Sequence, residues 1–105
     1  MIELRRYQRA PIDVDLEFTT KGGDRRLAGH AKDISLGGMF VTTAHPPAFG
    51  VEVVIHVTLP GQKAPFAMPA VVRWCRPDGI GVQFGNLGAR ETHAITELTG
   101  PAREP

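Results

Sequence analysis

The chain has 105 residues, of which 42% are apolar and 22% are charged, as expected for a single globular domain. Its 12 Lys and Arg residues against 11 Asp and Glu residues leave a net charge of +1, which disfavours a general nucleic-acid binder because such binding needs a broad excess of cations. A small anionic ligand remains compatible with this balance, since it requires only a local cluster of positive charge.

Apolar side chains recur at every second position over most of the chain, which predicts strands with one buried face and one exposed face. Residues 11–20 show the pattern most clearly, because apolar and acidic side chains alternate there. Two weaker segments are rich in residues that favour strands. In chain order, strands are predicted over residues 11–20, 26–34, 39–43, 51–59, 70–74 and 80–84.

Glycine and proline separate these strands. Residues 21–24 and 78–79 are typical of hairpin turns, and residues 60–61 (Pro-Gly) fit a type II turn. Pro65 and Pro69 lack an N–H group, so we expect their region to lie at a sheet edge or at the start of a strand. About six short antiparallel strands predict a mainly-β domain, either a small closed barrel or a sandwich.

A helical pattern follows the last strand. Its apolar stripe consists of Leu87, Ala94, Ile95 and Leu98. Asn86 is a suitable N-cap, and Gly100 followed by Pro101 is a suitable stop. So short a helix must be stabilised by docking on the barrel. We expect residues 101–105 to form a disordered tail.

Residue arrangements typical of enzymes and metal sites are nearly absent. The histidines are scattered without metal-ligand spacing, and the single Cys excludes both a disulfide framework and a zinc site of several thiolates. Cys75 is best interpreted as a small strand residue on the face opposite Trp74. Trp74 continues the alternation from Ala70 and Val72, which favours packing in the core or at the barrel mouth over a platform for stacking. No nucleophile is paired with a base, so we predict no enzyme activity, no catalytic residues, no metal and no cofactor.

The sequence also lacks signals for membranes and export. No run of residues is long and apolar enough to span a membrane, and the N-terminal residues contain no apolar core of a signal peptide. We therefore expect a cytoplasmic protein without a membrane partner.

Two polar segments are more informative. The first is a cationic cluster, Arg5, Arg6 and Arg9, just before the first strand; alone, it could be a solvated basic N-terminus. The second is residues 33–38, Asp-Ile-Ser-Leu-Gly-Gly, between two strands; alone, it could be a turn built from residues that bond local backbone.

Together, in this order, the two segments resemble the signature of the PilZ domain family, which is RxxxR followed by D/N-x-S-x-x-G. The matching positions are Arg5, Arg9, Asp33, Ser35 and Gly38. Residues 79–84, Gly-Ile-Gly-Val-Gln-Phe, also look like a late strand of the family. The resemblance implies a small six-stranded antiparallel β-barrel with one C-terminal helix over residues 1–100. It also implies that the ligand is the bacterial second messenger cyclic di-GMP.

The chemistry of the matched residues suits such a ligand. An arginine guanidinium can hold a phosphate or guanine O6 and N7 with two hydrogen bonds, and Arg6 could add to this field. The Asp33 carboxylate can accept from guanine N–H groups, and the Ser35 hydroxyl can donate to a phosphate oxygen. Gly38 lacks a side chain where a ligand would approach the backbone. Either one ligand or a stacked pair is compatible with these residues.

The resemblance implies a small adaptor whose output is passed to an unidentified downstream protein, in motility, exopolysaccharide or related control. Residues 1–10 would be a flexible arm that carries the arginines, on a monomer or weak dimer. One alternative is a PilZ-fold interaction module that does not bind nucleotide. Another is a small barrel for RNA or single-stranded DNA, which would require exposed aromatic residues along a basic groove. Most of the aromatic residues fall at strand positions expected to be buried, so we expect no nucleic-acid partner.

Overall fold

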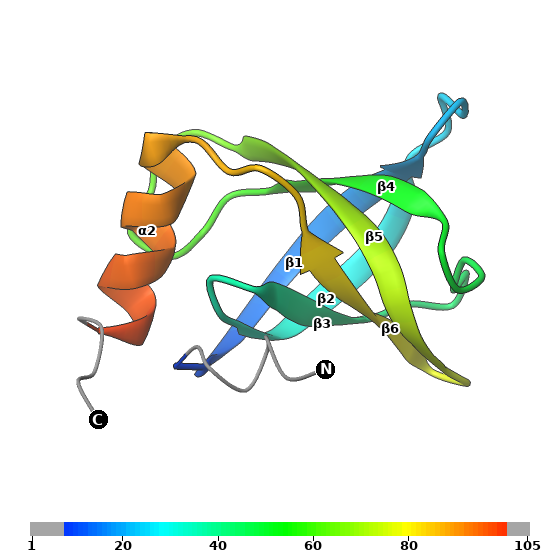
Figure 1. Ribbon diagram of the computed structural model, residues 1–105, viewed down its shortest axis with the longest axis horizontal. Helices are drawn as coiled ribbons and strands as arrows, with labels where there is room; N and C mark the ends of the chain where they lie inside the picture. Colours follow the sequence, from blue (N-terminus) through cyan, green and yellow to red (C-terminus); the bar gives the residue numbers. More distant parts are fainter. Residues whose placement is uncertain (1–7, 101–105) are drawn as a thin grey trace.

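The computed structural model describes residues 8–100, which form a closed barrel of antiparallel strands with a helix at one end (Figure 1). Around the barrel the strand order is β1-β2-β3-β6-β5-β4. The elements are β1 (Ala10–Thr20), β2 (Leu27–Ile34), β3 (Gly38–Thr42), β4 (Glu52–Val57), β5 (Phe66–Arg76), β6 (Gly79–Phe84) and α2 (Ala89–Thr99). The predicted mainly-β barrel with one C-terminal helix is confirmed, and the sandwich is excluded.

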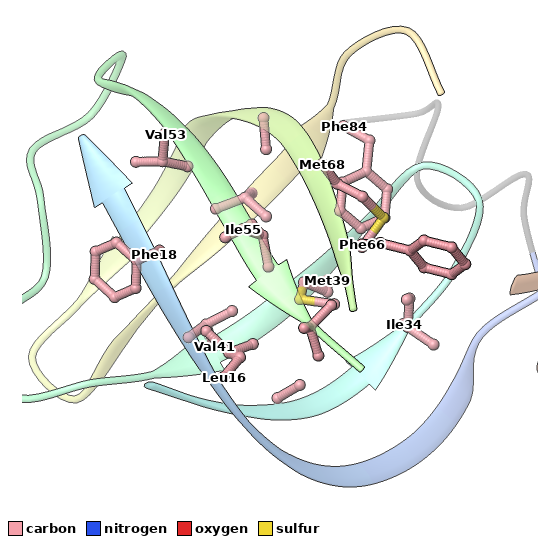
Figure 2. Close-up of a cluster of buried hydrophobic side chains, with 14 of the residues drawn as sticks. Leu16, Phe18, Ile34, Met39, Val41, Val53, Ile55, Phe66, Met68 and Phe84 are labelled. Carbon is pink, nitrogen blue, oxygen red and sulfur yellow. The ribbon is translucent and has the colours of Figure 1, made fainter. Parts of the chain in front are cut away.

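The alternating apolar side chains point into the barrel and fill it (Figure 2). Each strand contributes to this core, and many of its side chains are less than 2% exposed. The largest of these are Phe18, Ile34, Met39, Ile55, Leu59, Met68, Ile80 and Ile95. Because the interior is packed with side chains, any ligand or partner must use the outer surface or the ends of the barrel.

Turn chemistry follows the sequence closely at two connections. Gly22 has a φ of 83° in the turn after β1, and Gly61 has a φ of 84° in the turn after β4. Gln62 N–H donates to Leu59 O at 3.0 Å, which completes the predicted type II turn. The β5–β6 hairpin is also present, but its two connecting residues are 77–78, one position earlier than predicted.

Strand β5 is longer than predicted and contains Pro69 in its interior. Gly85 N–H donates to Pro69 O at 2.8 Å, so the nitrogen of Pro69 faces the same side of β5 as that carbonyl. On that side the pairing of β5 with β6 ends at Ala70 and Phe84. The missing N–H of Pro69 therefore removes no hydrogen bond between paired strands, as at a sheet edge.

A bulge in β5 reverses the expected orientation of Trp74. Val72 pairs with Val82, but Trp74 pairs with Gly81, so Arg73 is an extra residue. The Trp74 ring lies over Gly81, because a Cβ added there would come within 2.6 Å of it. Since Val82 points inward, this is the outer face of the barrel. The prediction that Trp74 continues the core alternation is wrong, because periodicity does not reveal a bulge.

Helix α2 stands at the end of the barrel away from the β5–β6 hairpin (Figure 1). Ala94 and Ile95 are buried against the barrel, while Leu87 and Leu98 pack at the margin of the core. The helix begins after Gly88 rather than Asn86, so the predicted N-cap is wrong; Gly88 makes no side-chain cap. The predicted end of the helix at Gly100 is correct. Gly100 has a φ of 86°, and its N–H donates to Thr96 O at 2.8 Å.

Gly38 of β3 has no room for a side chain, because an added Cβ would lie 1.9 Å from Val82 O on β6. We expect Gly38→Ala to lower the free energy of unfolding by about 3 kcal/mol, because two paired backbones must separate. Gly85→Ala is the matched control: its Cβ would be 3.7 Å from the nearest atom, so a change within about 0.5 kcal/mol is expected. Urea unfolding of both variants measures this, and equal stabilities would contradict the steric argument.

Candidate functional site

The two motif segments meet at an ion pair between Arg9 and Asp33. Arg9 precedes β1, and the register of β1 with β2 places Ala10 opposite Ile34. Arg9 Nη2 lies 2.7 Å from Asp33 Oδ1, although the residues are 24 positions apart. Both side chains are about one-third exposed, at 37% and 35%. The barrel thus brings these two predicted site residues together on its outer surface.

Arg5 and Arg6 lie outside the described residues, as do most of the proposed arm (1–7) and the proposed tail (101–105). Their roles stay predictions. Arg9 is the described end of the cationic cluster, and it directly precedes β1.

The Asp33 carboxylate is held by the backbone as well as by Arg9. Phe40 N–H, on β3, donates to Asp33 Oδ1 at 3.2 Å. Within residues 8–100, every hydrogen bond to this carboxylate goes to Oδ1. The second oxygen therefore has acceptor capacity, and its orientation is set by two contacts on the first.

Ser35 organises the turn between β2 and β3. It is fully buried, and its Oγ accepts hydrogen bonds from Gly37 N–H at 3.1 Å and Gly38 N–H at 3.3 Å. Ser35 N–H in turn donates to Gly38 O at 2.8 Å. The hydroxyl that we expected to donate to a phosphate donates instead to Gly38 O at 3.4 Å, which agrees with the interpretation of this segment as a turn. Direct contact between Ser35 and a ligand stays a prediction.

The fold requires a glycine at position 38, because any side chain there would clash with the Val82 carbonyl. Gly38 is buried, so a role in admitting a ligand to the backbone also stays a prediction. Of the matched family positions that are described, Arg9 and Asp33 are accessible to solvent, while Ser35 and Gly38 are buried.

An aromatic surface extends from Asp33 across the barrel, and the sequence analysis missed it. Strand pairing forms a row of Asp33, Phe40, Gly81 and Trp74, on four adjacent strands. The Phe40 ring lies near Gly79, where a Cβ would be 3.0 Å from Cζ, as Trp74 lies over Gly81. The alternating glycines Gly79 and Gly81 were the available signal, because they leave room for neighbouring rings on the outer face of β6.

Arg76 adds a second cation to this surface. Its guanidinium carbon lies 5.8 Å from the centre of the Phe40 ring, within the range of a cation–π contact. The row therefore carries one arginine beside Asp33 and another over Phe40. Planar rings and guanidinium groups next to a carboxylate can contact both the bases and the phosphates of a nucleotide.

A separate cluster of charged groups lies on the outer face of β1 and β2. His30 Nδ1 is 2.7 Å from Asp15 Oδ1, and Nε2 contacts Asp13 Oδ1. Hydrogen bonds to Asp15, which has the larger effect, and to Asp13 raise the pKa of His30 above 6.5.

Within residues 8–100, no three His, Cys, Asp or Glu side chains are arranged to hold a metal ion. No helix in that part of the chain is long and apolar enough to cross a membrane.

The raised pKa of His30 predicts a pH dependence. Below pH 6.5, the ordinary pKa of a histidine, protonated His30 stabilises the fold through its two carboxylate contacts. This stabilisation is lost as the pH rises through the higher pKa that His30 has in the folded state. We expect an NMR titration to give His30 a pKa above 6.5. In the double variant Asp13→Asn, Asp15→Asn the pKa of His30 should be lower, because both carboxylates are removed. His56 is the internal control, because burial, followed by the nearby Arg26, lowers its pKa. Titration of His30 at or below 6.5 would contradict the ion-pair geometry.

Comparison with known proteins agrees with this architecture. The sequence matches the family model described as PilZ domain over residues 3–100. A comparison with curated proteins finds no match. Among solved structures, the PilZ domain of YcgR from Escherichia coli with c-di-GMP has a TM-score of 0.71 at 18% identity, with 90% of this chain and 88% of that chain covered.

Two further structures have a TM-score of 0.69. The PilZ domain of CeSA from a cellulose-synthesizing bacterium is 19% identical and covers 87% of this chain and 93% of that one. The inhibitor of motility MotI/DgrA from Bacillus subtilis is 20% identical over 89% of this chain but only 48% of that one. Since the family model spans nearly the whole sequence and the barrel joins its two motif segments, the chain belongs to the PilZ domain family.

Proposed function

We propose that this protein binds cyclic di-GMP on the outer surface around Arg9 and Asp33 and passes the signal to a partner protein. The observation that carries the proposal is the Arg9–Asp33 contact, because it joins the two signature segments into one surface. PilZ domains are known as cyclic di-GMP receptors, and the similar E. coli structure contains c-di-GMP.

The charges of the site suit a ligand with two phosphates and two guanines. The Arg9 guanidinium can bind a phosphate or a guanine edge, either by giving up its contact with Asp33 or by using its remaining N–H groups. Arg5 and Arg6 belong to the same cationic segment of the sequence. Asp33 Oδ2 can accept from guanine N–H groups while Oδ1 keeps its bond to the Phe40 backbone. The rings of Phe40 and Trp74 offer apolar faces on which a base can stack.

We assign the protein a binding function rather than an enzymatic one. The groups around Arg9 and Asp33 can hold charge and planar rings, and no reaction is required to explain their arrangement. Signal output would come from the altered surface of the ligand-bound barrel. Control of motility is one proposed output, since the similar B. subtilis protein is described as an inhibitor of motility.

The arginines provide the first test. We expect Arg9→Ala and Arg5→Ala each to weaken cyclic di-GMP binding by about 2–4 kcal/mol, the range for truncating a charged anchor. Arg6→Ala should cost less, because it lies off the RxxxR spacing. Arg25→Ala is the matched control, an exposed arginine in the connection between β1 and β2. Isothermal titration calorimetry measures all four variants beside the unmodified protein.

The same titrations with GTP and cyclic GMP test whether binding is specific. Similar small losses for every variant, including Arg25→Ala, would indicate diffuse electrostatic attraction instead of a site. Absence of any binding by the folded, unmodified protein would favour the alternative, a PilZ-fold interaction module that does not bind nucleotide.

Asp33 provides the second test. We expect Asp33→Ala to reduce the preference for cyclic di-GMP over cyclic di-AMP, because a carboxylate facing guanine N–H groups discriminates between bases while phosphate contacts do not. Competition titrations with the two dinucleotides measure the ratio of affinities. If affinity falls but the ratio is unchanged, Asp33 positions Arg9 rather than contacting the base.

A further inference from the structure

The loop between β3 and β4 presents an isolated apolar side chain. Phe49 is 65% exposed and is the only large hydrophobic residue within residues 8–100 that is exposed. The loop is held in place, because Gly50 N–H donates to Val72 O at 2.8 Å and Val51 N–H to Ala48 O at 3.2 Å. Gly50 has a φ of 86°, a conformation that favours glycine. This loop lies at the end of the barrel away from α2 (Figure 1). Phe49 is therefore an exposed ring on a turn whose backbone is held by hydrogen bonds.

An apolar groove of about 410 Å³ lies on the outer face of β4 and β5. Val54, Pro69 and Val71 form its floor, Gly85 lies at one end, and Lys21 and Glu52 lie at the other. The groove is hollow at Gly85 because β6 ends at Phe84 and the next residue has no side chain to cover Pro69. Outward-facing strand positions are usually polar, so this apolar floor calls for an explanation.

Phe49 and the groove are neighbours on the same wall of the barrel. Gly50 is hydrogen-bonded to Val72, and the adjacent pair Glu52–Val71 lines the groove. The exposure of Phe49 shows that it does not fill the groove of its own chain. A projecting ring and a receptive groove side by side have the arrangement required of a two-fold contact, in which the same patch of each copy meets the other.

We propose that two copies of this chain associate through this wall, with Phe49 of each copy inserted into the Val54–Pro69–Val71 groove of the other. The groove has sufficient volume, since a cavity of about 150 Å³ already accommodates benzene. Lys21 and Glu52 are paired at 3.3 Å, so the rim carries no net charge and two copies can approach without repulsion. Each Lys21 can also face Glu52 of the other copy.

The resulting dimer is weak and independent of the nucleotide site. Two inserted rings bury limited apolar area, which supports a dissociation constant on the order of 100 µM. Arg9 and Asp33 lie at β1 and β2, and the two β5 residues of the aromatic surface, Trp74 and Arg76, do not line the groove. The proposal is therefore tested without ligand, and its failure would leave the proposed function unaffected.

Analytical ultracentrifugation of the full chain, from about 1 µM to about 1 mM, measures the association. We expect Phe49→Ala and Val71→Lys each to weaken the dimer at least about tenfold, as for truncating or blocking a central contact. Thr92→Lys, an exposed position on α2, adds the same charge away from the groove and should have no effect. Circular dichroism checks folding, and Val54→Lys replaces Val71→Lys if the latter does not fold.

Mixing the two variants gives the sharpest result. A dimer of Phe49→Ala with Val71→Lys retains one intact contact, the Phe49 of the second variant in the unmodified groove of the first. Each variant alone retains none, so an equimolar mixture should dimerise more than either component. A monomer throughout the concentration range, an unchanged dimer in Phe49→Ala, or a mixture no stronger than its components would overturn the proposal.

Discussion

The antiparallel register of β1 with β2 determines both the core and the site of this protein. It places Phe18 opposite Leu27 at one end and Ala10 opposite Ile34 at the other. A slip of one residue would turn the buried side chains of β1 outward and its acidic ones inward, so the register is strongly specified by burial. Arg9 and Asp33 flank the Ala10–Ile34 pair on a diagonal, so the same register that buries Ala10 and Ile34 brings the two charged side chains within reach of each other.

The family signature divides into residues that build the fold and residues that face solvent. Ser35 ties the β2–β3 turn together from within, and Gly38 allows β3 to approach the Val82 carbonyl. Asp33 and Arg9 then project from this rigid support. A substitution at Ser35 can therefore affect ligand binding through the turn without any contact to ligand, because the position of Asp33 depends on the backbone that follows it.

Glycines near the two ends of β6 shape the outer surface of the barrel. Gly79 and Gly81 leave two outward positions of β6 without side chains, and the rings of Phe40 and Trp74 lie close to them. At the other end of β6, Gly85 leaves Pro69 uncovered and the groove open. The first gap is filled from within the chain by neighbouring aromatic residues, whereas the second is left for a partner. The difference follows from where β6 ends relative to β5.

The sequence by itself determined the strand periodicity, the glycine turns at Gly22 and Gly61, the helix stop at Gly100 and the order of the two family motifs. These features depend on neighbours along the chain, so local patterns reveal them. Only the tertiary structure decided that β1 closes on β4 and β3 on β6, that Asp33 bonds both Arg9 and the Phe40 backbone, and that a bulge turns Trp74 outward. Each of these depends on pairing between distant strands, whose register and irregularities are set by how all six fit around one core, and no local repeat in the sequence records that fit.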